Sequence, residues 1–487
     1  MDDTAARARL SGRDYWPFAL AAAHSLHTLW YASVYPEVVY DPDLLAYFVY
    51  FRNWLTGTTS LHDATYFTVP KPLLVFLLGP LDSALAAFTV SALAAGAFGA
   101  LVYLITRQAF GRTVAVLCSA VLLLDIDRAT LTTRASADFF LTLFVFASIY
   151  AVLVRRWALA GIAIALAGLV KPVALPCMLP LLVIEGADRR RAWAGAAIAL
   201  VALPLTLLSN QALLGSPFGT QRFFAGFASM TDGTQMPTGD LLRFVLWIEL
   251  AKTIFTVTAP FGVIGLAVWI GRDKRHLTHP FFLAPLALLA GYVLLSVTTP
   301  FVAFFRFFWP VQVWFACFVV FGIVETCRCL APQPRALRLG ITAALLFFLF
   351  DEQMARQLRY RSHFAAPFQE AMAFVGATDG LLASERTDGQ SILTSPALLP
   401  YLLWTIDDAR RHPSLIRMAE VHQNDGGAPP DWVLYIPQFF LRQDTRESVD
   451  ALLSSGIYEP VMGSGNIGAL YVRRDHREAL TRVHSPG

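Results

Sequence analysis

The chain has 487 residues, of which 56% are hydrophobic and only 15% are charged. Soluble domains carry nearer to about a quarter charged residues, so this composition excludes a single large soluble core. The formal net charge is only +3, which gives no support to nucleic acid as a partner.

Apolar segments long enough to cross roughly 30 Å of hydrocarbon recur along the first 351 residues. We therefore predict a mainly α protein, a polytopic transmembrane helical bundle with about eleven spans over residues 1–351, surrounded by membrane lipids. The expected spans are 15–35, 84–106, 112–126, 137–154, 157–171, 172–184, 191–209, 244–271, 279–299, 307–327 and 336–351.

Positive charges predict the orientation of these spans. Arginine and lysine residues gather before the first and seventh spans and after the fourth and eighth. Such loops are cytoplasmic, which places the N-terminus inside. Residues 157–184 could form one long helix or two short ones, and Lys171-Pro172 favours two because proline interrupts a helix. An odd number of spans then places the C-terminal tail outside.

The first outer loop, residues 36–83, is long and has its own pattern. After Asp41-Pro42-Asp43, apolar residues follow a helical period as far as Leu55, and Gly57 ends the segment. This pattern is typical of an amphipathic helix in the membrane interface. A second short apolar segment, 73–81, predicts another interfacial helix.

The tail, residues 352–487, changes to mixed charge. It has strand-like runs at 391–394, 432–436 and 469–472, and helical stretches at about 363–377 and 445–455. We predict a small extracytoplasmic α/β domain.

Two carboxylate pairs are candidates for chemistry. Asp41 and Asp43 stand just outside a span, where a carboxylate can act as a general base, but aspartate is also a strong helix N-cap. Asp125 and Asp127 could hold a divalent metal ion, with His62 as a further ligand, or could form an ordinary span end beside Arg128. His24 and His27 share a helix face, where histidines more often line a polar interior than bind metal.

Several outer cations could bind a lipid phosphate. Lys71 and Lys171 each precede a proline at an expected helix start, and Arg134 and Arg306 also lie on the outer side. Phosphate at that depth requires such partners. The alternative is that these side chains only anchor helix ends at the interface.

Five motifs occur together in chain order: Asp41-Pro-Asp43 followed by Tyr47 and Gly57, Pro70-Lys71-Pro72-Leu73, Arg134-Ala-Ser-Ala-Asp138, Leu166-Ala-Gly-Leu-Val-Lys171-Pro172, and Gly468-Ala-Leu-Tyr471-Val-Arg473. Together they resemble the GT-C superfamily of membrane glycosyltransferases, which includes protein O-mannosyltransferases and aminoarabinose transferases. One proline of the family's "KPPL" segment is replaced here by leucine, and the acidic residues are spaced rather than adjacent.

The resemblance implies an inverting hexosyl- or pentosyltransferase in a bacterial inner (plasma) membrane. Its donor would be a polyprenyl-phosphate sugar, and its acceptor a hydroxyl of a glycan, lipid or protein on the outer face. Asp43 or Asp41 would be the base, with Asp43 favoured. Lys71, Lys171, Arg134 and Arg306 would bind the donor phosphate, and Asp138 or Asp127 would support the sugar charge.

Two other classes are compatible with a polytopic chain. A lipid or sugar transporter or flippase would show repeat symmetry between its halves, and the sequence shows none. A non-catalytic membrane scaffold would not need acidic and basic residues gathered in one long outer loop.

Overall fold

The computed structural model describes residues 14–34, 40–57, 70–219, 258–298, 309–329, parts of 336–355, 366–386, 389–395, 398–405, 415–418, 429–439 and 443–476. The chain forms two compact units. The helical unit comprises Met1–Val34, Phe88–Pro204 and Thr238–Tyr360. The mixed unit comprises Tyr35–Ala87, Leu205–Pro237 and Arg361–Gly487. The first outer loop and the C-terminal tail from Arg361 onward therefore belong to the same unit.

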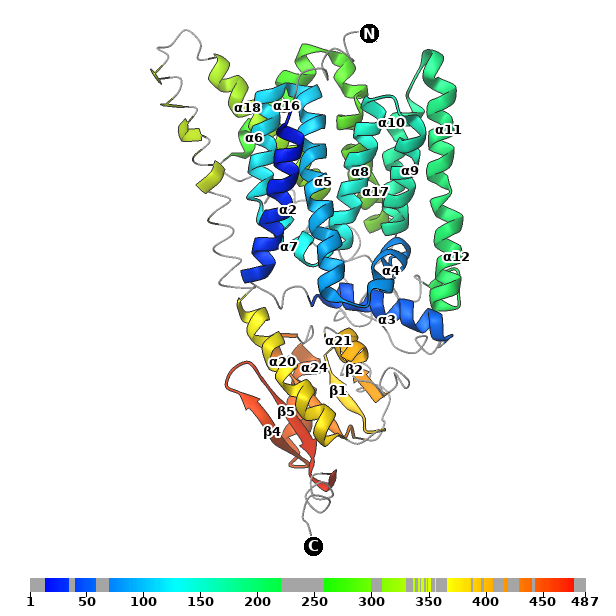
Figure 1. The fold of residues 1–487 in the computed structure, drawn as a ribbon, viewed down its shortest axis with the longest axis vertical. Coiled ribbons are helices and arrows are strands. Elements are labelled where there is room, and N and C mark those ends of the chain that lie inside the picture. The colour runs from blue at the N-terminus through cyan, green and yellow to red at the C-terminus, as the bar shows by residue number, and fades with distance from the viewer. Residues whose placement is uncertain are drawn as a thin grey trace. The chain divides into compact units, whose positions relative to one another are not determined.

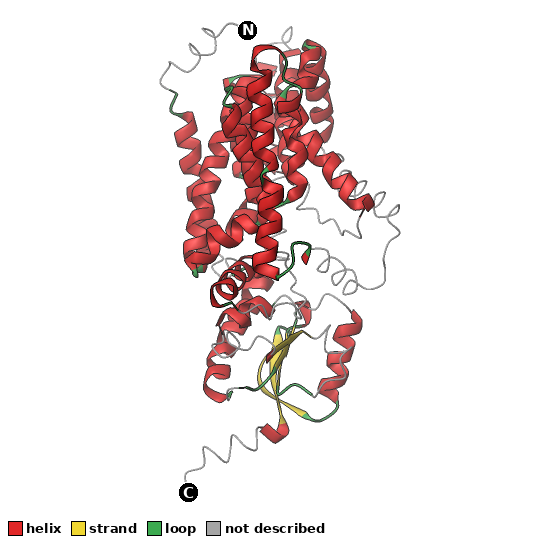
Figure 2. Ribbon diagram, turned by 90° about the vertical axis from the view of Figure 1, so that its right-hand side faces the viewer, coloured by secondary structure: helices red, strands yellow, loops and turns green. Residues whose placement is uncertain are grey.

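The helical unit is a bundle of apolar helices that run largely side by side (Figures 1 and 2). The helices that lie wholly or partly in this unit are α2 (Trp16–Val34), α5 (Ala84–Phe110), α6 (Arg112–Leu123), α7 (Ile126–Thr133), α8 (Ala137–Leu153), α9 (Trp157–Val170), the 3₁₀ helix η4 (Pro172–Met178), α10 (Leu179–Leu182), α11 (Arg189–Leu200), α12 (Ala202–Leu214), α16 (Ala259–Arg272), α17 (Pro280–Thr298) and α18 (Trp309–Cys329). The start of α5, up to Ala87, and most of α12, from Leu205, belong to the mixed unit.

Length and composition alone qualify three helical segments of the described chain to cross a membrane: Ala84–Phe110, Gly186–Leu214 and Trp309–Cys329. A fourth candidate is the pair Asp127–Thr133 and Ala137–Leu153, which is bent by 108° at its break. The other apolar helices are shorter. The count of about eleven spans therefore stays a prediction.

The expected helix break before Pro172 is confirmed. Helix α9 ends at Val170, Lys171 is extended with φ −148°, and η4 starts at Pro172. Proline suits the first position of a helix because its missing N–H would have no intrahelical acceptor there. The alternative prediction of a single long helix over 157–184 is wrong.

A sharp turn joins α7 to α8. Ala135 has a left-handed φ of +46°, which is uncommon for a residue with a Cβ, and Ser136 accepts a hydrogen bond from the Asp138 amide at 3.2 Å. The sequence analysis treated this stretch as a connection. The structure instead places the short helix α7 in it.

Small residues allow two helix pairs to pack closely. A Cβ on Gly161 of α9 would clash with the carbonyl oxygen of Gly195 on α11. A Cβ on Gly322 of α18 would clash with the carbonyl oxygen of Phe261 on α16. Packing of backbone on backbone is a main source of helix association in membranes, where burial of apolar surface drives little.

Replacing Gly322 with alanine should therefore destabilise the helical unit. One added methyl has no space, and overpacking costs about 1–3 kcal/mol. We expect a lower thermal midpoint in detergent, followed by intrinsic fluorescence. Gly271→Ala on α16 is the matched control, because its Cβ would meet no atom within 4 Å. Equal midpoints for the two variants would contradict the packing argument.

The mixed unit combines outer-loop helices with a sheet. The loop supplies α3 (Pro42–Thr56), α4 (Pro72–Leu78) and the 3₁₀ helix η3 (Gly79–Leu81). The tail supplies a five-stranded sheet of order β2-β1-β3-β5-β4, in which β1 pairs in parallel with β2 and β3, and β5 is antiparallel to β3 and β4. Its elements are α20 (Ala366–Glu385), β1 (Ile392–Thr394), α21 (Leu399–Thr405), β2 (Ile416–Met418), β3 (Trp432–Tyr435), α24 (Gln443–Ser454), β4 (Tyr458–Ser464) and β5 (Gly468–Arg473).

The three strands expected from sequence are present as β1, β3 and β5, and the two expected helices as α20 and α24. These strands have apolar runs because they occupy the interior of the sheet. Strands β2 and β4 were not predicted. They form its edges, and β4 contains Pro460 and Gly463, which are tolerated at edges and irregularities.

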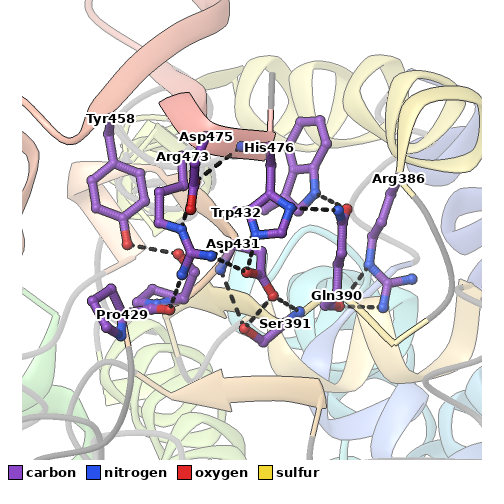
Figure 3. Close-up of polar contacts among 11 residues, drawn as sticks. Arg386, Gln390, Ser391, Pro429, Asp431, Trp432, Tyr458, Arg473, Asp475 and His476 are labelled. Atoms are coloured by element: carbon purple, nitrogen blue, oxygen red, sulfur yellow. Dashed lines mark hydrogen bonds and ion pairs between the residues drawn. The ribbon is translucent and has the colours of Figure 1, made fainter. Parts of the chain in front are cut away.

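A polar network fastens one end of this sheet (Figure 3). Asp431 accepts hydrogen bonds from the Ser391 amide at 2.7 Å and the Ser391 hydroxyl at 3.0 Å. It also pairs with Arg473 at 3.3 Å and His476 at 2.8 Å. Both carboxylate oxygens of Asp431, which directly precedes β3, are thus occupied by groups at the start of β1 and at or just after the end of β5, which marks the network as structural.

Candidate active site

The acidic turn of the first outer loop forms the N-terminus of α3. Asp41 is the N-cap, and its carboxylate accepts a hydrogen bond from the Asp43 amide at 2.9 Å. Asp41 is buried, Pro42 occupies the first helical position, and Asp43 lies half-buried in the first turn. The capping role therefore falls to Asp41, and the Asp43 carboxylate is not the cap. Gly57 ends the helix with a left-handed φ of +67°, as expected.

Helix α3 is present as predicted, but its burial changes along its length and does not follow one face. The stretch Leu44–Tyr50 is buried, whereas Trp54 and Leu55 are exposed near its end. Phe76 of α4 is also exposed and meets Trp54 edge-on, with ring centroids 5.2 Å apart. This outward apolar surface fits the expected position in a membrane interface.

The C-terminal tail contacts the acidic turn through α21. Arg52 of α3 donates a hydrogen bond to the Leu403 carbonyl at 2.6 Å. The ring of Tyr401 lies edge-on to that of Tyr40, with centroids 6.3 Å apart. Neither α21 nor this contact was predicted from the sequence. Its only local signal is the aromatic run around Tyr401 and Trp404, which could equally belong to a core.

The two lysines that precede prolines have different surroundings. Lys71 is the half-buried residue at the start of α4, with φ −104° and no side-chain capping hydrogen bond. Lys171 forms an ion pair with Asp138 of α8. The side chains of Lys171 and Asp138 are only 12% and 1% exposed, so this pair is buried. The structure thus joins a cation and a carboxylate to which the resemblance assigned separate roles.

Arg134, the third expected phosphate ligand, ends α7 immediately before the turn that leads to Asp138. The tight turn thus keeps Arg134 and Asp138 at adjoining helix ends within the helical unit.

The Asp125 carboxylate is engaged in structural hydrogen bonds. It caps α7 by accepting hydrogen bonds from the amides of Asp127 and Arg128, each at 3.3 Å. The indole of Trp309 donates to its second oxygen at 3.0 Å. The interpretation of Asp125 and Asp127 as an ordinary helix end beside Arg128 therefore describes their geometry better than a metal site does.

Arg128 is fully buried and its guanidinium is held by α2 and the end of α6. It donates to the hydroxyl of Thr28 at 3.0 Å, contacts Nδ1 of His27 at 2.6 Å and donates to the carbonyl of Leu122 at 2.9 Å. Burial of a guanidinium costs free energy unless such hydrogen bonds compensate for lost water. His27 and Thr28 therefore serve to accommodate Arg128.

The metal hypothesis finds no ligand set in the described residues. Nowhere among them do three or more histidine, cysteine, aspartate or glutamate side chains come together in a way that could hold a metal ion. His24 contacts the carbonyl of Ser119 at 3.1 Å, in line with a histidine that lines a polar interior. His62 and Arg306 lie outside the described residues.

Solved structures resemble this chain over almost its whole length. ArnT from Cupriavidus metallidurans bound to undecaprenyl phosphate aligns with 93% of this chain and 97% of its own, with a TM-score of 0.54 and 15% identity. Its apo state aligns with 94% and 99%, with a TM-score of 0.52 and 14% identity. This chain has the GT-C fold. The fold expected from the sequence motifs is confirmed, while no protein-family profile and no curated protein sequence matches the chain.

Within this GT-C fold, the buried pair of Lys171 and Asp138 yields a stability prediction. Lys171→Met deprives the Asp138 carboxylate of its cation, and breaking a buried pair costs about 3–5 kcal/mol. The double variant Lys171→Met with Asp138→Asn should recover much of that loss, because no charge remains buried. A double-mutant cycle on unfolding in detergent measures the coupling.

Arg191→Gln is the control, because its pair with Asp188 is 3.9 Å long and its side chain is 78% exposed. Such a surface pair is worth about 0–1 kcal/mol. If Lys171→Met cost no more than Arg191→Gln, the buried ion pair would not contribute as argued.

Proposed function

We propose that this chain is an inverting membrane glycosyltransferase that moves a sugar from a polyprenyl-phosphate donor to an acceptor hydroxyl on the outer face of the membrane. The acceptor would be a glycolipid, a polysaccharide or a protein. The observation that carries the proposal is the nearly full-length likeness to ArnT with undecaprenyl phosphate bound. Because one fold can host many reactions, the site residues must supply the rest of the argument.

Asp43 is the proposed base. Asp41 serves as the helix cap, and Asp43 lies half-buried beside it in the first turn of α3, so we assign the base to Asp43. It would take the proton of the acceptor hydroxyl as the hydroxyl oxygen attacks the anomeric carbon. The new carbon–oxygen bond forms while the bond to the phosphate oxygen breaks, and polyprenyl phosphate leaves with the electron pair. A single displacement of this kind inverts the anomeric carbon.

The cations are assigned to the donor phosphate. Lys71 stands at the start of α4, and Lys171, Arg134 and Arg306 are further proposed ligands. In the described structure Lys171 is paired with Asp138, so a phosphate that binds Lys171 would compete with this carboxylate. Lys171 would then be paired with Asp138 before the donor binds and with the donor phosphate afterwards, so its buried charge would have a partner in both states.

The reaction itself can be tested with purified protein and a panel of radiolabelled polyprenyl-phosphate sugars. Each donor is offered with a glycolipid, a polysaccharide or a peptide acceptor, and label in the acceptor is counted. We expect transfer from at least one donor and release of polyprenyl phosphate. If no donor is consumed, but labelled lipid crosses the bilayer of reconstituted vesicles, the transporter hypothesis replaces this one.

The base is identified by paired variants. Asp43→Asn should lower kcat by more than about 100-fold, because general base catalysis contributes about 10²–10⁴-fold. Asp41→Asn should have the smaller effect, since asparagine caps helices as well as aspartate does. Circular dichroism and thermal midpoints confirm that both variants are folded. Loss of transfer in Asp41→Asn alone would instead name Asp41 as the base.

A further inference from the structure

We propose that helix α21 of the C-terminal α/β region positions the acidic turn of the first outer loop for sugar transfer, with Tyr401 and Trp404 as its positioning residues. This inference rests on the proposed function and gives the tail a role in the same reaction. None of the positioning residues is assigned contact with substrate.

Aromatic contacts bring α21 to the start of α3. Tyr40 immediately precedes the cap residue Asp41, and its ring meets Tyr401 edge-on with an interplanar angle of 83°. Trp404 lies 6.2 Å from Tyr40 and 5.8 Å from Phe48, measured between ring centroids. Trp404 therefore contacts α3 both before its cap and at its second turn, and restrains the direction in which the helix starts.

Two hydrogen bonds also join α21 to the first outer loop. The Leu403 carbonyl lies in the last turn of α21, where carbonyl oxygens lack intrahelical partners, and it accepts from the Arg52 guanidinium at 2.6 Å. A cation is favoured at this end by the helix dipole. The Trp404 indole donates to Asp82, after η3, at 2.9 Å. Helix α21 thus contacts the residue before the cap of α3, the last part of α3 at Arg52, and Asp82 at the end of η3.

Tyr401 also contacts a buried carboxylate, whose ionised form is unfavourable in the folded state. Asp379 of α20 accepts a hydrogen bond from Tyr401, and burial raises the pKa of Asp379 to about 6. Its other oxygen, Oδ1, is buried with no hydrogen-bond partner in the described part of the chain. The titratable groups that act on the pair there are Tyr401 and, beyond it, Tyr40, and no cation is among them.

The raised pKa of Asp379 lowers the stability of the folded protein at neutral pH. The folded state holds the Asp379 proton more tightly than the unfolded chain does, so stability falls as the pH rises from about 4 through about 6. An asparagine would accept the same hydrogen bond without that cost. The ionised form, however, makes a charge-assisted bond that fixes the Tyr401 hydroxyl and with it the ring against Tyr40.

The first test compares two tyrosines that each lose only a hydroxyl. Tyr401→Phe removes the bond to Asp379, while Tyr458→Phe, on β4 of the same unit, removes a buried hydrogen bond of 2.6 Å to the Pro430 carbonyl. We expect Tyr401→Phe to lower kcat about 5- to 20-fold with donor KM within about twofold, because small misplacement of a reacting group can cost up to about 100-fold. Tyr458→Phe should lower the thermal midpoint at least as much and leave kcat unchanged.

The second test uses the pH profile, which a purely structural role would not move. Wild-type kcat should fall as Asp379 becomes protonated below a pH of about 6. Asp379→Asn cannot titrate, so its profile should lose that step while its stability at neutral pH rises. Hydrogen exchange of residues 42–56 should be faster in Tyr401→Phe than in Tyr458→Phe.

Equal kcat for the Tyr401 and Tyr458 variants, or an unchanged pH step in Asp379→Asn, would overturn the positioning role and leave the proposed transfer reaction standing. A wild-type protein that transfers no sugar from any donor would overturn the transfer reaction and this role with it. The wild-type assay thus separates the two failures.

Discussion

Charged side chains inside the apolar helical unit depend on partners that the protein itself provides, and this constraint places most of the polar groups described above. Arg128 is surrounded by hydroxyl, imidazole and carbonyl groups, and Asp138 is paired with Lys171. Both arrangements occur at helix ends: Arg128 lies in the first turn of α7, Asp138 lies in the first turn of α8, and Lys171 lies at the break between α9 and η4. Helix ends offer backbone groups without intrahelical partners, so they can accept charge where a continuous helix cannot.

The mixed unit meets a different requirement, since its acidic turn is held by contacts within that unit. The contacts that hold this turn come both from neighbouring residues and from residues far away in the sequence. Asp41 caps the helix that begins there, and Arg52 on the same helix is anchored to the tail. The cap residue Asp41 and the proposed base Asp43 thus lie in the same helix start, two positions apart. Residues held in this way by packing and hydrogen bonds have a defined geometry even though they lie in a connecting segment.

Much of this arrangement was predictable from sequence where the signal is local. Periodicity and a terminal glycine predicted α3, and Pro172 predicted the break after α9. Distant partners were not predictable. Nothing in a single sequence reports that Arg52 bonds to Leu403, 351 positions away, or that Lys171 pairs with Asp138. Helix α7 was missed because its eight residues are mostly polar, and its burial depends on neighbours that periodicity cannot identify.

The buried guanidinium also constrains how the chain enters a membrane. Arg128 is made 101 residues after His27, so α2 is already present when α7 leaves the ribosome. Inserting an arginine alone costs about 3 kcal/mol, and ready partners on α2 reduce that cost at once. Asp125 must wait for Trp309, which is synthesised 184 residues later. The contacts of α2 with Arg128 can therefore form before the contact of Trp309 in α18 with Asp125, because α18 is synthesised later.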